Sequence, residues 1–379
     1  MVAVDKNISY FKGKHETKID EEYLKNEMAQ FLQIDNLNFL IGAGCSSHVE
    51  DDTEYGIPGM INLYKGFFEK YPDFEIAGNK AEPLFAENLE KMLEVMGAIS
   101  VAGEISIIDS DIADKIATVQ KYIRQRVIDG LHGEEVLNFY HTFYMKTVAR
   151  GRKNPINIFT TNYDLYNEQA LDALSFPYNN GFVGTYKRTF NPASYKYAYV
   201  EDMNLSKNVW ERVPNFYNLY KLHGSISWIK NGNTINEIDY KHIGNDDTVM
   251  IYPTPLKDRT TLMTPYSDLF RAMETALLKK NSVLITLGYS FADDHINRLI
   301  LNSLAIPTFK LVIFGKSEAI TRLTELNDSR IIVINSDDHI HYFKNFVEKA
   351  MPNLQEDVKE QIDLPAVSEI TKAFEGVKE

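Results

Sequence analysis

The chain has 379 residues, of which 44% are hydrophobic and 25% charged, a balance typical of one large α/β domain or of a few smaller globular domains. This composition excludes a mainly disordered chain, a collagen and a coiled coil. The 53 acidic and 40 basic residues give a net charge of −13. Because nucleic-acid-binding proteins carry basic surfaces, we expect no direct contact with nucleic acid.

The number of cysteines and the lengths of the apolar segments indicate in which cellular compartment the protein is located. Cys45 is the single cysteine, so the chain forms no intrachain disulfide and no cysteine-rich zinc site. The charged N-terminal segment does not resemble a signal peptide, and no apolar stretch reaches the length of a membrane span. We therefore expect a cytoplasmic protein with no membrane association and no structural zinc.

The first part of the chain predicts a nucleotide-binding unit with a helical insertion. The polar residues 1–20 indicate an N-terminal arm, and apolar spacing predicts a helix over 21–33. The apolar strand expected at 37–41 runs directly into a glycine turn, which is the order that opens a dinucleotide-binding unit. Residues 60–150 carry apolar stripes among charges and no clear strand, so they predict a helical insertion.

The second part alternates strands and helices. Strands are expected at 156–160, 225–229, 248–252, 282–288, 309–315 and 330–336, and helices at 165–174, 264–280, 292–304, 317–326 and 339–350. Residues 178–215 are expected to be irregular or β-rich. The fold class is therefore α/β: a Rossmann-like parallel sheet with helices on both faces and a helical insertion. This domain would span 37–350, between an N-terminal arm and helix (1–36) and a C-terminal tail (351–379).

Candidate site residues follow the predicted strands. In Gly42-Ala43-Gly44 the glycines would let the backbone approach a pyrophosphate, although a tight turn alone would also explain them. Asn162 could hold a ribose hydroxyl or a water, or simply end its strand. Asp164 could cap the next helix.

Two further candidates lie later in the chain. His223 is suited to proton transfer near neutral pH, with a structural role as the alternative. The Gly288-Tyr289-Ser290 turn suits a phosphate or ribose, and the alternative is a helix start where Asp293 or Asp294 complements the helix dipole. In parallel sheets ligands bind beyond the carboxyl ends of the strands, where all these residues are expected.

Four separated motifs occur in one order: GAGCS with a following GIP, then TTNYD, KLHGS and GYSF. Together they resemble the sirtuin superfamily over residues 37–318, and more closely the sirtuin-like NADase effectors of prokaryotic antiphage defence. The chain departs from deacylating sirtuins in four ways, of which one is a longer loop between Gly44 and Gly56. Gly59-Met60-Ile61 replaces Asp-Phe-Arg, Thr161 replaces a Gln, and the four-cysteine zinc module is missing. These departures count against deacylation and leave NAD+ cleavage intact.

The resemblance implies an NAD+ glycohydrolase that releases nicotinamide and ADP-ribose. Asn162 would position the ribose or the attacking water, and His223 would act as general base. NAD+ would be held by Gly42, Ala43, Gly44, Cys45, Ser46, Asp164, Gly288, Tyr289, Ser290 and Lys316. The alternatives are an NAD-dependent protein deacylase and a non-catalytic module that binds NAD or ADP-ribose.

An unregulated NADase would kill its own cell, so a trigger is expected. The regions outside 37–318 are short for a ligand-sensing domain. By resemblance we expect a homo-oligomer with a separate partner, a HerA-type hexameric translocase ATPase first and a short-Argonaute-type protein second. The amphipathic helices between 88 and 150 and the Tyr-rich stretch 186–220 are candidate oligomer surfaces, and core packing is the alternative for each.

Overall fold

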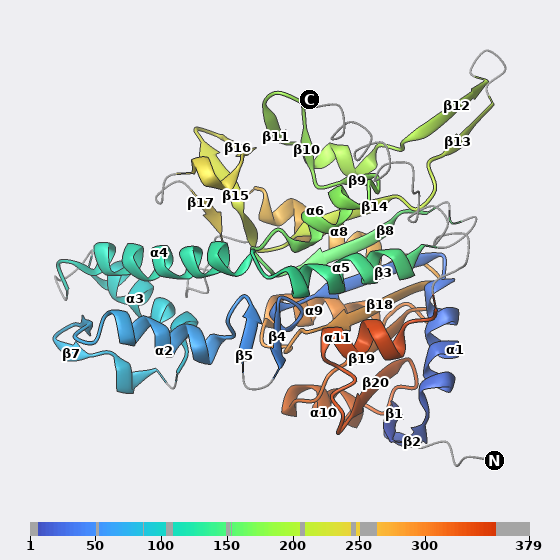
Figure 1. Cartoon of the computed structure of the whole chain (residues 1–379), viewed down its shortest axis with the longest axis horizontal. Helices are drawn as coiled ribbons and strands as arrows, with labels where there is room; N and C mark the ends of the chain where they lie inside the picture. Colours follow the sequence, from blue (N-terminus) through green and yellow to red (C-terminus); the bar gives the residue numbers. More distant parts are fainter. Residues whose placement is uncertain are drawn as a thin grey trace, which may run out of the picture.

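A nine-stranded sheet forms the centre of the molecule (Figure 1), with the strand order β2-β1-β20-β19-β18-β3-β8-β14-β9. The computed structural model describes residues 7–50, 53–85, 87–103, 109–148, 152, 154–204, 209–243, 248–250 and 264–353. Seven neighbouring strands run parallel: β20 (Ile331–Ser336), β19 (Lys310–Phe314), β18 (Ser282–Leu287), β3 (Asn36–Ile41), β8 (Ile156–Thr160), β14 (Tyr217–Lys221) and β9 (Tyr178–Asn179). The strands expected at 37–41, 156–160, 282–288, 309–315 and 330–336 are confirmed.

Helices cover both faces of this sheet, as expected from its continuous apolar strands. In β3, Phe39 packs on one face and Leu40 on the other. The Phe39 face is covered by α1 (Glu21–Leu32), α5 (Glu134–Thr147), α6 (Tyr166–Ala173) and α11 (Phe343–Asn345), which continues as a π-turn over Phe346–Ala350. The Leu40 face is covered by α8 (Tyr266–Leu277), α9 (Asp294–Ser303) and α10 (Glu318–Glu325). The predicted fold class is confirmed.

The insertion between β3 and β8 is mainly helical. It contains α2 (Met60–Lys70), α3 (Leu89–Ala102), α4 (Ile112–Gly130) and α5, with small additions at β4 (Ser47–Glu50), β5 (Thr53–Gly56), β6 (Glu75–Ile76), β7 (Asn79–Lys80) and the 3-10 turn Glu82–Leu84. Figure 1 shows α2, α3 and α4 extending to the left, away from the sheet. The main apolar stripes of α3 and α4, which include Met92 and Val119, are buried within the chain. Core packing therefore explains these stripes.

The expected arm over residues 1–20 is wrong for most of its length. β1 (Ile8–Lys12) and β2 (His15–Ile19) form a hairpin, and β1 pairs antiparallel with β20. Ile8 and Tyr10 are buried against the sheet, whereas most side chains of β2 are exposed, and their polarity hides the strand in the sequence. The sheet is consequently mixed at this edge. Of the expected tail, residues 354–379 lie outside the described residues.

A second, antiparallel sheet is formed by strands before, within and after the Tyr-rich stretch 186–220. Its strand order is β10 (Phe182–Val183), β11 (Arg188–Phe190), β16 (Thr234–Glu237), β15 (Gly224–Asn231) and β17 (Thr248–Met250). The strands expected at 225–229 and 248–252 therefore lie outside the parallel sheet, and 251–252 fall outside the described residues. β12 (Val200–Asn204), β13 (Val209–Arg212) and the 3-10 turn Pro192–Lys196 complete the region that was expected to be irregular or β-rich. Within the described ranges no helix is long and apolar enough to cross a membrane.

Candidate active site

The carboxyl ends of four adjacent parallel strands carry the candidate motifs. β18, β3, β8 and β14 are neighbours in the sheet. Just beyond their ends lie Gly288, Gly42, Asn162 and His223, respectively. Segments far apart in the sequence therefore meet at one edge, which is where ligands of parallel sheets bind.

A cavity of about 560 Å³ opens at this edge, and we call it the carboxyl-edge cavity. Its polar side includes Ser46, Asn162, Asp164, His223 and Asp293. The helical insertion supplies apolar lining through Met60 and Leu63 of α2 and Ile123 and Val127 of α4, and Glu90 of α3 adds a carboxylate. The sequence showed these helices to be amphipathic but did not indicate that they cover the site.

The side chain of Asn162 is fixed by its neighbours. Its Nδ2 donates to the Gly42 carbonyl oxygen at 3.0 Å and to the Ser46 Oγ at 2.8 Å. Ser46 in turn donates to Asp164 Oδ2 at 2.6 Å, so its hydroxyl orients Asn162. The Oδ1 of Asn162 is buried and accepts no hydrogen bond from the described residues. Because a buried polar atom without a partner is costly, this oxygen is suited to receiving a donor from a ligand or water.

Asp164 connects the site to the next helix. Its Oδ1 accepts from the amide of Tyr166, the first residue of α6. The expected helix cap at Asp164 is wrong, because Leu165 occupies the N-cap position and Asp164 makes a local turn contact just before it. The ammonium of Lys221 donates to the Asp164 carbonyl oxygen and lies 3.1 Å from Glu168 Oε1. Burial raises the pKa of Glu168 to about 7, although Lys221 opposes this shift.

His223 is held by a carboxylate that the sequence analysis treated only as a helix-start residue. The Nε2 of His223 lies 3.0 Å from Asp293 Oδ2. The other oxygen, Asp293 Oδ1, accepts from the amides of His295 and Ile296 at the start of α9. Asp293 therefore both caps α9 and orients His223. The signal for the second role is its place after the GYSF motif, which follows β18 at the same carboxyl edge of the sheet as His223.

The two glycine turns pack against each other. The amide of Gly42 donates to the Leu287 carbonyl at 2.9 Å, and that of Gly44 donates to the Gly288 carbonyl at 3.0 Å. A Cβ on Gly42 would lie 2.5 Å from the Gly288 oxygen, and one on Gly44 would lie 3.0 Å from the Gly288 Cα. Close packing of the turns is thus sufficient to require these glycines. The backbone approach to a pyrophosphate at Gly44 stays a prediction.

The other expected NAD+ contacts separate into two groups. Ala43, Gly44, Ser46, Asp164, Gly288, Tyr289 and Ser290 line the carboxyl-edge cavity. Cys45 is buried in the core, where burial raises the pKa of its thiol, and it is not among the lining residues. Lys316 also lies outside the lining and pairs with Asp337 at 3.6 Å. The structure thus gives neither Cys45 nor Lys316 a side-chain position against a ligand in this cavity.

Residues 156–334 match the family model of the SIR2-like domain. The match supports the assignment of this chain to the sirtuin-like superfamily. It includes Asn162, His223 and the GYSF turn, whereas the glycine turn at 42–44 lies before it. No curated protein matches the chain. SIR2-like domains are NAD-dependent enzymes, so the match indicates NAD-dependent activity in general.

Proposed function

We propose that this sirtuin-like protein is an NAD+ glycohydrolase that releases nicotinamide and ADP-ribose. The observation that carries the proposal is the meeting of Asn162 and His223 in one cavity, each already held by other side chains. Asn162 presents a buried oxygen without a partner, and His223 is oriented by Asp293. Fixed polar groups of this kind favour a charged transition state because little reorganisation is needed during the reaction.

The carboxyl-edge cavity has the properties that NAD+ requires. Its volume of about 560 Å³ lies within the usual range of small-molecule sites. The apolar lining residues Met60, Leu63 and Val127 suit the nicotinamide ring, whereas the polar lining residue Asn162 suits the adjoining ribose. The Gly44 and Gly288 turns would then lie along the phosphates.

The residues suggest a direct hydrolysis. Nicotinamide leaves with the electron pair of the glycosidic bond, and positive charge develops on the ribose. The carboxylates of Asp164 and Asp293, which line the cavity, favour that charge. Asn162 Oδ1 accepts a hydrogen bond from a ribose hydroxyl or from the attacking water. His223 takes the proton that this water loses as the new C–O bond forms, and later releases it to solvent.

The cellular role we propose is antiphage defence by NAD+ depletion, with activity controlled by self-assembly and by a HerA-type translocase ATPase. A short-Argonaute-type protein is the second choice of partner. The helical insertion supports this control, because α2 and, through Glu90, α3 line the cavity while Ile61 of α2 and Val95 and Val101 of α3 are exposed. A partner that contacts those side chains would act on the cavity wall through the helices that carry them.

One experiment separates the candidate activities. The purified protein is incubated with NAD+, with and without an acetyl-lysine peptide, and the products are identified. We expect nicotinamide and free ADP-ribose in equal amounts whether or not the peptide is present. Turnover that requires the peptide and yields acetylated ADP-ribose would establish the deacylase instead, and binding without turnover would establish the non-catalytic module.

A second experiment tests control by a partner. The isolated chain and its complex with the ATPase are compared for NAD+ cleavage, and we expect the complex to be more active. Val101→Glu should weaken the activation, and the matched variant Leu326→Glu, at another exposed apolar side chain, should not. Equal turnover by the isolated chain and the complex would overturn the proposed control without affecting the proposed reaction.

A further inference from the structure

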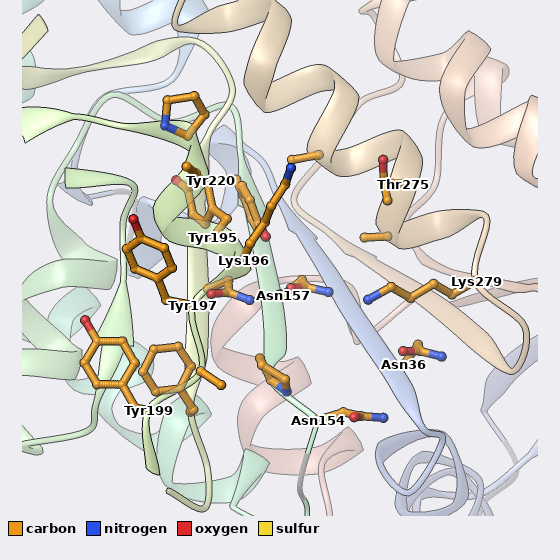
Figure 2. A pocket seen from close by; sticks show the side chains of 18 of the residues that line it. Asn36, Asn154, Asn157, Tyr195, Lys196, Tyr197, Tyr199, Tyr220, Thr275 and Lys279 are labelled. Atoms are coloured by element: carbon orange, nitrogen blue, oxygen red, sulfur yellow. Dashed lines mark hydrogen bonds between the residues drawn. The ribbon is translucent and has the colours of Figure 1, made fainter. Parts of the chain in front are cut away.

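A second cavity, of about 590 Å³, lies at the opposite edge of the sheet, and we call it the amino-edge cavity. It is lined by the first residues of β3, β8 and β14, by α8 and by the segment that begins with the 3-10 turn Pro192–Lys196. Figure 2 shows four tyrosines of this cavity on one side and Thr275 and Lys279 on the other. It shares no lining residue with the carboxyl-edge cavity.

A row of buried asparagines crosses the sheet and ends in this cavity. Asn38 donates to Ser282 Oγ at 2.9 Å, Asn157 donates to Asn38 Oδ1 at 2.8 Å, and Asn218 donates to Asn157 Oδ1 at 3.2 Å. The three asparagines occupy equivalent positions in β3, β8 and β14. Asparagine is depleted in strands, so three in register are not explained by strand formation.

Asn218, the last asparagine of the row, has side-chain atoms that make no hydrogen bond within the described part of the chain. Asn218 is 7% exposed and lines the cavity, and within the described part of the chain its Oδ1 accepts no hydrogen bond. Its Nδ2 has given one hydrogen to Asn157 and keeps a second. Asn218 can therefore offer one acceptor and one donor side by side to a ligand.

Aromatic and cationic side chains complete the lining. Tyr195 stacks on Tyr220 with 4.2 Å between ring centroids, and the exposed rings of Tyr197 and Tyr199 offer further stacking surfaces. Lysine and arginine side chains also line the cavity: Lys196, Arg212, Arg271 and Lys279. Asp268 is the acidic residue among the lining residues, and it pairs with Arg271 at 3.8 Å. The described lining therefore carries an excess of positive charge in an acidic chain.

We propose that the amino-edge cavity binds an adenine nucleotide. A paired donor and acceptor on an asparagine side chain match the amino group and the adjacent ring nitrogen of adenine. Tyrosine rings stack on bases, and lysine ammonium groups bind phosphate oxygens. Asn218 would read the base, and Lys279, whose ammonium points toward Asn157 in Figure 2, would hold the phosphate. This site is independent of the NAD+ glycohydrolase proposal.

Calorimetric titration with AMP tests the proposal, with GMP, adenosine and inorganic phosphate as separate arms. We expect AMP to bind more tightly than each of the other three. Lys279→Glu should weaken AMP binding by about tenfold or more, because an attractive charge becomes a repulsive one. Lys280→Glu is the matched control, since this neighbour does not line the cavity, and it should bind AMP like the wild type. Asn218→Leu should reduce the preference for AMP over GMP.

Location is tested with a photoreactive azido-AMP and mass-spectrometric mapping of the labelled peptides. We expect label in the peptides that contain Tyr195–Tyr199 or Lys279. Label confined to the Gly42–Ser46 or Gly288–Asp293 peptides would place AMP in the carboxyl-edge cavity and overturn the proposal. It would also be overturned if the wild type bound no AMP, or if Lys279→Glu and Lys280→Glu bound it equally.

Discussion

Asn162 uses its amide hydrogens on Gly42 and Ser46, and this leaves the amide oxygen in a fixed position with nothing from the described protein bound to it. A side chain held in this way loses little conformational entropy when a ligand binds. His223 is held in a similar way by Asp293, 3.0 Å away. Both residues therefore make structural contacts in addition to the catalytic roles proposed for them, which explains why the structural and catalytic interpretations of the sequence were difficult to separate.

Asn162→Ala and His223→Ala should each lower NAD+ cleavage by roughly 100-fold or more, the usual scale for a positioned acid–base group. Each variant removes one of the two groups expected to contact the ribose or the water. The measurement is the initial rate of nicotinamide release. NAD+ affinity and the unfolding temperature are measured alongside, because a loss of activity that arises only from unfolding would favour the structural interpretation of both residues.

Asp293→Asn separates the two roles of this residue. One oxygen remains to accept from the His295 amide, so the α9 cap should persist, and asparagine is among the best capping residues. The negative charge facing His223 is lost, and the rate of NAD+ cleavage should fall with a changed pH profile. Asp293→Ala should lose about 1 kcal/mol of stability in addition. An unchanged pH profile in the folded Asn variant would contradict the positioning role.

Gly44 is less useful as a test of ligand binding than its sequence context indicates. A side chain there would meet the Gly288 turn before any ligand, since the added Cβ would lie 3.0 Å from the Gly288 Cα. Loss of NAD+ binding in Gly44→Val would therefore report the packing of the two turns as well as an obstructed pyrophosphate.

At the scale of elements, β14 and α6 are joined by the buried pair of Lys221 and Glu168. The folded protein raises the pKa of Glu168 from its ordinary 4.5 to about 7, mainly because burial disfavours the charge. Between these two values the folded state keeps a proton that the unfolded state releases. The stability supplied by this proton is fully present below pH 4.5 and is lost as the pH rises toward 7.

The substitution Glu168→Gln should reduce the pH dependence of the free energy of unfolding between pH 4.5 and 7. The free energy of unfolding of the wild type should fall relative to that of the Gln variant as the pH rises through the window, by an amount on the order of 3 kcal/mol at most. Urea unfolding at several pH values from 4.5 to 8 measures it, with Glu16→Gln at an exposed position as the control. Parallel curves for wild type and Glu168→Gln would show that Glu168 titrates normally.

The elements that the sequence predicted correctly are those with strong local patterns. β3, β8 and β18 are mainly apolar and almost wholly buried, and each ends in a recognisable turn or polar motif. β2 is short and polar and gains its place only through pairing with β1, so no local pattern marks it. The assignment of β15 to a separate sheet depends on its antiparallel pairing with β16, which a strand's own composition does not encode.

In the candidate site, too, the features marked by a local sequence pattern were predictable and those that depend on tertiary packing were not. Asn162, His223 and the two glycine turns were predictable because each follows a strand and strand ends converge. The pairing of His223 with Asp293 was not, since it depends on the orientation of a side chain whose capping role already explained its presence. The apolar wall from α2 and α4 required knowledge of how the insertion packs against the sheet.

At the scale of the whole molecule, the N-terminal hairpin covers the edge of the sheet. β1 pairs with β20 along residues Ile8–Lys12, and without this hairpin β20 would present unpaired backbone groups. A variant that lacks residues 1–19 should be less stable and should self-associate, which light scattering and thermal unfolding measure. Glu16→Ala, at an exposed position of β2, should change neither. A deletion variant with the stability and the oligomeric state of the wild type would show that β20 needs no cover.

The pairing of β1 with β20 also determines when the sheet can be completed during synthesis. Residues 8–12 are synthesised more than 300 residues before residues 331–336, so the hairpin must wait for its partner while the chain between them is translated. Asp293 likewise emerges long after His223, which it orients. A nascent or prematurely terminated chain that stops before Asp293 lacks the partner strand of β1, and its His223 lacks the carboxylate that orients it. We therefore expect such fragments to leave NAD+ intact, so that the proposed cleavage would occur only in chains that contain both pairings.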